Sequence, residues 1–168
     1  MTFETMLTGG HPNSLGRTLE VVDAVLADEG RLVDLLDCYR SDDEVVRLRT
    51  SNAVKRVTIE HPGWTVRQMD RIQNEVAAID QPSTQWTLAL LFDLTWDLLD
   101  EAQRERALAI MRRNLAEHDD WIVLNNAAKV LAKRDPERAT LRPHFERLAR
   151  DARKSVASNA RKALKAIG

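Results

Sequence analysis

Apolar residues recur at helical spacing along almost the whole chain, and this recurrence is itself repeated. The clearest copy consists of Val46, Thr50, Ala53 and Val57. Its members follow the spacing i, i+4, i+7, i+11, which keeps one face of an α-helix apolar. Successive copies start 31, 38, 39 and 33 residues apart, at Leu15, Val46, Thr84, Val123 and Val156. No segment shows the alternation of a β-strand, so the pattern predicts an all-α protein.

One further amphipathic helix fits between consecutive copies, so the repeating unit is a helical hairpin. A single hairpin cannot bury its own apolar face, and neighbouring hairpins must therefore stack. The pattern predicts a solenoid of about four hairpins, forming one domain over residues 1–168, with residues 1–13 as a loosely packed N-terminal cap. A closed helical bundle is the alternative, because a bundle needs no fixed period.

Local signals divide the chain into helices. A short helical turn is expected at 3–8, and longer helices are expected at 14–29, 31–40, 43–60, 64–80, 83–98, 101–117, 120–134, 140–151 and 153–167. Ser41 and Glu44 have the spacing of a capping box, and Pro82 suits a first helical position. Asp119 is predicted to cap the helix that begins near Trp121.

The sequence Ser-Asp-Asp-Glu-Val-Val-Arg at Ser41–Arg47, followed by small and apolar residues at Ala53 and Val57, resembles the inner helix of a HEAT repeat. The stretch His118–Val123 is a more degenerate copy. The resemblance covers most of the chain from about Ser14. It implies a HEAT-like, armadillo-type fold, a right-handed α-α superhelix, and an interaction scaffold rather than an enzyme.

The composition excludes several other classes. Of 168 residues, 43% are hydrophobic and 30% charged, which is typical of a folded chain rather than a disordered one. One cysteine, and four histidines without an HxxxH or HxH pair, disfavour a metal site, and no glycine-rich phosphate-binding motif is present. Cys38 is expected to be a small buried hydrophobe. No cofactor is predicted.

The N-terminal stretch and the apolar runs bear on localisation. The first ten residues contain Glu4 and no basic residue, unlike a signal peptide. No apolar run reaches the roughly 20 residues that span a bilayer. The chain is therefore expected to be soluble and cytoplasmic, with no membrane partner.

A short stretch after residue 95 raises an enzymatic alternative. Trp96 and Asp100 have the spacing of a Trp-Asp-x-x-Asp-like motif that, in DNA alkylation repeat glycosylases, faces the damaged base. Those enzymes also stack HEAT-like hairpins. The competing interpretation is that Trp96 belongs to the core and Asp100 caps the next helix.

One helix face is a candidate partner-binding surface. If the second helix of each hairpin lines the concave side, basic and amide side chains fall on one ridge, with an apolar patch in its centre. This predicted ridge consists of Arg49, Asn52, Arg56, Trp86, Leu90, Asn126, Lys129, Lys133, Asn159 and Lys162. Amides can bond a partner's backbone and cations its acidic groups, so the ridge predicts a protein or acidic-peptide partner. A nucleic acid is the alternative, since a phosphate backbone fits the same chemistry.

The charge is unevenly distributed. From Lys133 to Gly168 the chain has 11 Lys and Arg against 4 Asp and Glu, although the net charge of the whole chain is −1. A basic end on an acidic body favours binding of a polyanion, or self-association through the acidic surface of another copy.

Overall fold

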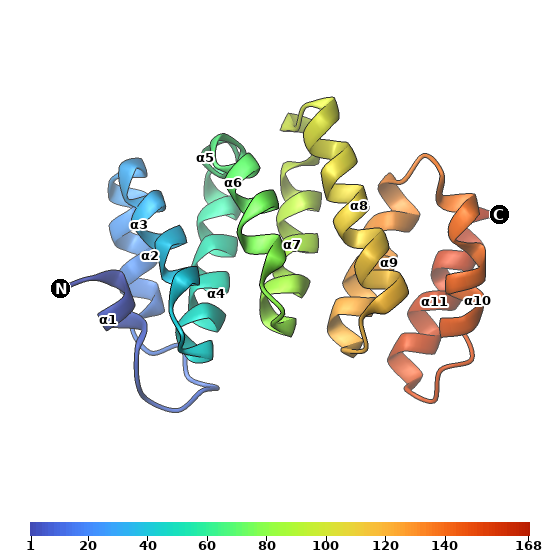
Figure 1. Cartoon of the computed structure of the whole chain (residues 1–168), viewed down its shortest axis with the longest axis horizontal. Coiled ribbons are helices and arrows are strands. Elements are labelled where there is room, and N and C mark those ends of the chain that lie inside the picture. The colour runs from blue at the N-terminus through green and yellow to red at the C-terminus, as the bar shows by residue number, and fades with distance from the viewer. The chain divides into compact units, whose positions relative to one another are not determined.

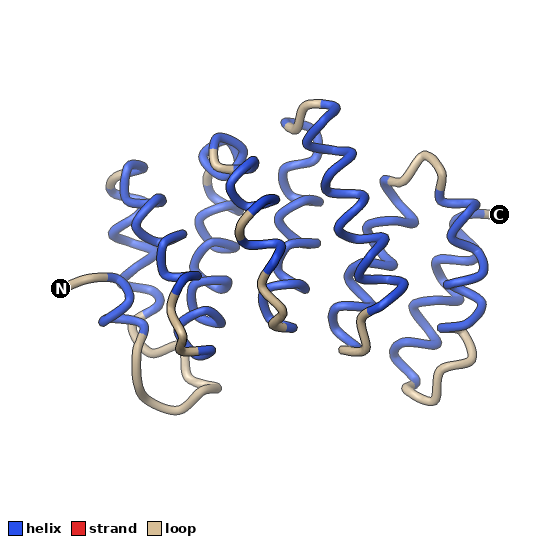
Figure 2. The backbone as a smooth tube through the Cα atoms, in the orientation of Figure 1, coloured by secondary structure: helices blue, strands red, loops and turns tan.

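The computed structural model describes residues 1–168 and consists of α-helices, short 3₁₀-helices and connecting turns, without a strand (Figure 2). The prediction of an all-α protein is confirmed. The chain divides into two compact units, Met1–Leu99 (unit 1) and Asp100–Gly168 (unit 2). None of the helices combines the length and the apolar character that a membrane span requires.

Unit 1 contains seven α-helices and four short 3₁₀-helices. The α-helices are α1 (Phe3–Leu7), α2 (Thr18–Ala27), α3 (Leu32–Asp37), α4 (Glu44–Glu60), α5 (Pro62–Arg67), α6 (Met69–Asn74) and α7 (Pro82–Thr95). The 3₁₀-helices are η1 (Glu29–Arg31), η2 (Cys38–Arg40), η3 (Val76–Ala78) and η4 (Trp96–Leu98). Helix α4 packs against α2 on one side and α7 on the other (Figure 1).

The α4 face predicted to be apolar forms the centre of this unit. Val46, Ala53 and Val57 are fully buried, and Thr50 joins them because its hydroxyl donates a hydrogen bond to Val46 O at 2.8 Å. That internal bond satisfies the only polar group that Thr50 would otherwise bury unpaired. The buried face of α4 was therefore predicted correctly.

The first copy of the repeat was predicted with the wrong helix start and the wrong face. Helix α2 begins at Thr18 instead of residue 14, and Leu15 and Leu19 are exposed. Its buried face is formed by Thr18, Val21, Val22 and Val25, of which the predicted spacing contained only Val22. The residues before Thr18 form a loop, so the apparent period that began at Leu15 ran across a helix boundary.

The N-terminal segment was expected to be loosely packed, and the structure instead shows it anchored. Phe3 and Leu7 are buried, and the guanidinium of Arg31 lies 4.2 Å above the centre of the Phe3 ring. The predicted helix 64–80 also differs, because the chain leaves helical geometry at Gln68, between α5 and α6. No proline or glycine marks that break in the sequence.

Unit 2 contains four α-helices, namely α8 (Glu101–Glu117), α9 (Trp121–Arg134), α10 (Arg142–Leu148) and α11 (Lys154–Ile167), with the 3₁₀-helix η5 (Arg138–Leu141) before α10. Helix α9 packs between α8 and α11 (Figure 1). The predicted apolar faces of both helices are buried, at Val123 and Ala127 on α9 and at Val156 and Ala160 on α11.

The helix caps were predicted in part. Asp100 caps α8 in a capping box with Gln103, as its position suggested. The caps of α4 and α9 were each misplaced: Asp43 caps α4 instead of Ser41, and Asp120 caps α9 instead of Asp119. In both cases the acidic residue directly before the first helical residue reaches the free N–H groups, so the nearer of two candidates provides the cap.

A buried carboxylate fixes the end of α9. Asp135 is fully buried and accepts two hydrogen bonds from Arg112 of α8, at 2.8 and 2.6 Å. It also accepts the backbone N–H of Glu137 at 2.8 Å. Bidentate, charge-assisted hydrogen bonds from arginine are strong, and this pair ties the C-terminal end of α9 to α8.

Candidate functional site

Four residues of the predicted ridge meet in one groove within unit 2. Lys129 and Lys133 come from α9, and Asn159 and Lys162 come from α11. The groove has a volume of about 440 Å³. The two α9 lysines are one helical turn apart, about 6 Å along the axis. The α9–α11 groove therefore presents three ammonium groups from two neighbouring helices.

The floor of the α9–α11 groove is formed by small side chains. Ala132 of α9 and Ala163 and Ala166 of α11 complete its lining. Methyl groups leave room for a partner's backbone or apolar side chain to approach closely. Of these alanines, only Ala132 was not singled out from the sequence, whereas Ala166 continues the helical spacing of Asn159 and Lys162.

The charged residues that line the α9–α11 groove are all basic. No residue lining it is acidic, and the three lysine side chains are exposed. Lys129 and Lys162 take part in no ion pair. The amide of Asn159 donates to Ser155 O at 3.0 Å, which leaves its carbonyl oxygen and second N–H available to a bound group. The arrangement can neutralise carboxylates and hold one peptide group at the same time.

Arg49 was predicted to be an exposed ridge residue, and this prediction is wrong. Its side chain is only 2% exposed. The guanidinium donates to four backbone carbonyls of the N-terminal segment, those of Leu7 (2.6 Å), Gly9 (2.6 Å), His11 (3.1 Å) and Ser14 (3.1 Å). The ridge on α4 is covered at this point because the N-terminal segment folds over it.

The other ridge positions of unit 1 do not line the α9–α11 groove. Asn52 and Arg56 are half-buried on α4 and bond each other, since Arg56 Nε donates to Asn52 Oδ1 at 2.7 Å. Trp86 and Leu90 are half-buried on α7. Asn126 is half-buried on α9, one turn before Lys129, and is not part of the groove lining.

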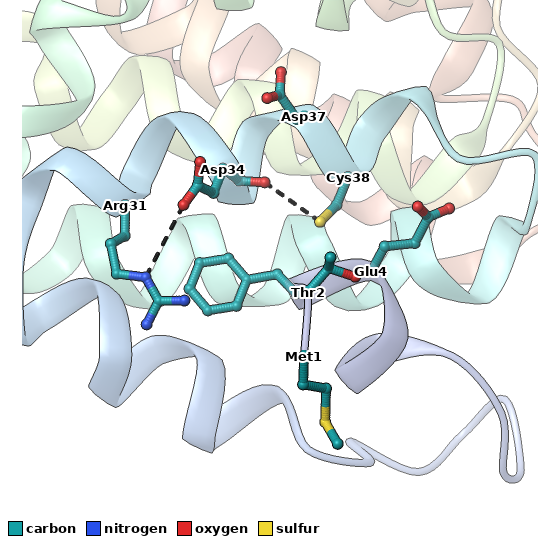
Figure 3. A pocket seen from close by; sticks show the side chains of 8 residues that line it. Met1, Thr2, Glu4, Arg31, Asp34, Asp37 and Cys38 are labelled. Atoms are coloured by element: carbon teal, nitrogen blue, oxygen red, sulfur yellow. Dashed lines mark hydrogen bonds and ion pairs between the residues drawn. The ribbon is translucent and has the colours of Figure 1, made fainter.

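A second cavity, of about 430 Å³, lies in unit 1 between the N-terminal segment and α3 (Figure 3). Its charges are mixed: Arg31 Nε is 4.0 Å from an Asp34 carboxylate oxygen, and Glu4 lies at the other end of the cavity, on the side of Cys38. Asp37 points away from Met1 in this view and binds Arg71 at 2.6 Å. The lining carries three carboxylates and one guanidinium, so the cavity lacks the purely basic character of the α9–α11 groove.

Cys38 borders this second cavity and is poorly suited to nucleophilic chemistry. It is 5% exposed, and its Sγ is 3.5 Å from Asp34 O, to which it donates (Figure 3). Burial, reinforced by the carboxylates of Glu4, Asp37 and Asp34, raises the pKa of the Cys38 thiol to about 11. The thiolate is therefore scarce at neutral pH. The predicted burial of Cys38 is confirmed.

The two residues of the glycosylase-like motif have ordinary structural settings. Asp100 accepts the backbone N–H of Gln103 at 2.8 Å as part of its cap, and Trp96 is half-buried at the start of η4. No three His, Cys, Asp or Glu side chains lie together in a way that could hold a metal ion.

Comparison with protein-family models, with curated proteins and with solved structures yields no match for this chain.

Proposed function

We propose that this chain is a non-enzymatic binding module whose α9–α11 groove takes an acidic segment of a protein partner. The observation that carries the proposal is the convergence of Lys129, Lys133 and Lys162 with Asn159 on one groove that has no acidic lining. Carboxylates would face the ammonium groups, and the Asn159 amide would bond the backbone of the segment.

The groove floor favours a peptide over a nucleic acid. Single-stranded nucleic acids gain much of their affinity from bases stacked on aromatic side chains, and the α9–α11 groove has none. Its alanine floor instead suits an apolar side chain set among carboxylates. A segment in which Asp and Glu flank a Leu or Phe therefore fits the groove chemistry best.

The proposed module is a HEAT-like, armadillo-type scaffold. Within unit 2, α9 and α11 are equivalent helices of successive hairpins, with buried faces 33 residues apart in sequence. Stacked hairpins of this kind leave one helix of each pair facing a shared surface. The right-handed superhelix is part of the same proposal, as is the absence of an enzymatic role for Trp96 and Asp100.

Binding of a fluorescein-labelled acidic peptide, with Asp and Glu around a central Leu, tests this function. Fluorescence anisotropy at 50 mM salt would be compared for the wild type and the variant Lys129→Glu/Lys162→Glu. We expect saturable binding by the wild type and a loss of at least tenfold in the variant, because two attractive charges become repulsive. The matched control is Lys154→Glu/Lys165→Glu, which changes the same charge on exposed α11 positions outside the groove.

Three results would contradict the proposal. The first is no binding by the wild type, and the second is equal loss in both double variants, which would indicate a diffuse charge effect. The third is tighter binding of a single-stranded or duplex DNA probe than of the peptide, with a steep dependence on salt. That result would support the nucleic-acid alternative.

A further inference from the structure

The two units carry opposite charge. Unit 1 has 16 Asp and Glu against 9 Lys and Arg, a net charge of −7, and unit 2 has 10 against 16, a net charge of +6. The sequence analysis divided the charge at Lys133. The structure moves the division to the boundary between the two units, so each unit is an oppositely charged folded body.

Part of the acidic charge of unit 1 lies on two turns that are distant in sequence and joined by a hydrogen bond. Asp42 and Glu44 precede and begin α4, and Asp80 precedes α7. The turns are joined by Gln81, whose Nε2 donates to Glu44 O at 2.9 Å (Figure 1, lower end of α4 and α7). We call Asp42, Glu44 and Asp80 the acidic edge.

The three carboxylates of the acidic edge are available to a partner. All three residues are exposed, and none forms an ion pair within the chain. Asp43 is occupied as the cap of α4, and the nearby Arg47 is half-buried and donates to Gln81 Oε1 at 2.6 Å. The acidic edge thus presents as many carboxylates as the α9–α11 groove presents ammonium groups.

We infer that the acidic edge of one copy docks in the α9–α11 groove of a second copy, in a head-to-tail arrangement. This inference rests on the proposed function, because it names a second copy as the acidic occupant. The spacing is compatible: two residues of extended chain, Asp42 to Glu44, span at most about 7 Å, and Lys129 to Lys133 span about 6 Å. Opposite net charges on the two units also steer the encounter.

A head-to-tail contact leaves one groove and one acidic edge unused at the ends, so it generates chains or a closed ring. The contact consists mainly of exposed ion pairs, and each contributes little. We therefore expect weak association, visible at high micromolar concentration and reduced by salt. Sedimentation equilibrium of the wild type at 50 and 500 mM salt measures this directly.

Two variants test the assignment of the surfaces. Lys129→Glu/Lys162→Glu disables the groove and leaves the acidic edge, whereas Asp42→Lys/Glu44→Lys disables the acidic edge and leaves the groove. Each alone is expected to be monomeric at concentrations where the wild type associates. Mixed at equal concentration, they are expected to associate again, because the intact acidic edge of one variant meets the intact groove of the other and the two reversed surfaces also carry opposite charges.

The mixture also tests whether a variant is monomeric only because it is misfolded, since a misfolded variant would not restore association. A chain with both pairs of substitutions has exchanged charges and is expected to associate with itself again. The inference is overturned if the wild type stays monomeric at 1 mM protein and low salt, or if the mixed variants do not associate. Acidic-peptide binding by the monomeric Asp42→Lys/Glu44→Lys variant separates the two proposals: if it persists without self-association, the proposed function stands and this inference falls.

Discussion

The ridge on α4 and the ridge shared by α9 and α11 have nearly the same sequence pattern and different surroundings. Each carries basic side chains one helical turn from an amide. On α4, Arg49 is buried against the N-terminal segment, and Arg56 bonds Asn52. In unit 2, Lys129 and Lys162 remain exposed and line a groove. The pattern alone does not distinguish an exposed groove from a packing surface.

The difference lies in what covers each ridge and in which cation is present. Arginine is a good buried cation, because its planar guanidinium can donate several hydrogen bonds at once in a fixed geometry. Arg49 uses this geometry to hold four carbonyls. A lysine ammonium is strongly hydrated, so lysines on a ridge indicate a surface open to solvent. The choice between Arg and Lys is thus informative where the spacing is not.

The largest expected effect comes from Arg49→Met, which removes the buried guanidinium from the α4 ridge. The change leaves four carbonyls without their donor and should lower the free energy of unfolding by about 2–4 kcal/mol. Urea unfolding followed by circular dichroism measures the loss, and hydrogen exchange should show faster exchange at residues 8–16. Lys129→Met is the matched control and should change stability by less than about 0.5 kcal/mol. Equal effects at both positions would remove the distinction between the two ridges.

Gly16→Ala should produce the next largest effect, since it acts on the same buried guanidinium. Gly16 has a φ of +53°, and an added Cβ would lie 3.0 Å from Arg49 Cζ. Backbone strain and this contact together should cost about 1–2 kcal/mol of unfolding free energy.

Gly9→Ala provides the control for that experiment. Gly9 also has a positive φ, of +78°, but its added Cβ would meet nothing within 4 Å. The difference between the two alanine variants therefore isolates the contact with Arg49. In an Arg49→Met background this difference should disappear. Persistence of the difference would show that the guanidinium is not what restricts Gly16.

Much of the fold followed from the sequence, because the buried helix faces are set by local spacing. The buried faces of α4 and α9 were predicted residue by residue from the copies starting at Val46 and Val123, and that of α11 from the copy starting at Val156 except at Ile167, which is half-buried. The failures occurred at ends and breaks. Leu15 continued the helical spacing into a loop, and Gln68 interrupts a helix without a sequence signal. Such features depend on contacts with distant residues: beside Leu15, the loop backbone is held by Arg49 of α4, which donates to Ser14 O.

The candidate site could be predicted only in part, for the same reason. Lys129, Lys133, Asn159 and Lys162 were placed on one ridge by spacing alone, and the structure brings them to one groove. Arg49 was placed on that ridge too, and only the tertiary fold shows that residues 7–14 cover it. The acidic edge could not be predicted from the sequence, since it requires the hydrogen bond between Gln81 and Glu44, which are 37 positions apart.

Ala166→Leu tests the floor of the exposed α9–α11 groove and is expected to have a smaller effect. The larger side chain would fill part of the α9–α11 groove floor, so the affinity for the acidic peptide should fall about fivefold, or about 1 kcal/mol. Stability should be unchanged, because Ala166 is exposed and leucine is a good helix former. Ala109→Leu, exposed on α8, is the control for added apolar surface. Tighter binding by Ala166→Leu would show that the floor is a contact surface with space to spare.

The smallest effect concerns how α11, the second wall of the groove, is held at its start. Asp151 accepts hydrogen bonds from the Arg153 side chain at 2.9 and 2.8 Å and from its backbone N–H at 2.8 Å. These bonds lower the pKa of Asp151 to about 2 from an ordinary 3.8, with the side-chain bonds the larger cause. A depressed pKa means that the carboxylate stabilises the fold above pH 4 and that this contribution is lost as the pH falls from about 4 to about 2.

Carbon-detected NMR titration of the Asp151 carboxyl group should give a midpoint near 2. In Arg153→Met, which removes the larger cause, the midpoint should return toward 3.8, and the start of α11 should fray at a higher pH than in the wild type. An unchanged midpoint in Arg153→Met would show that backbone geometry, not the arginine, fixes this end of the groove.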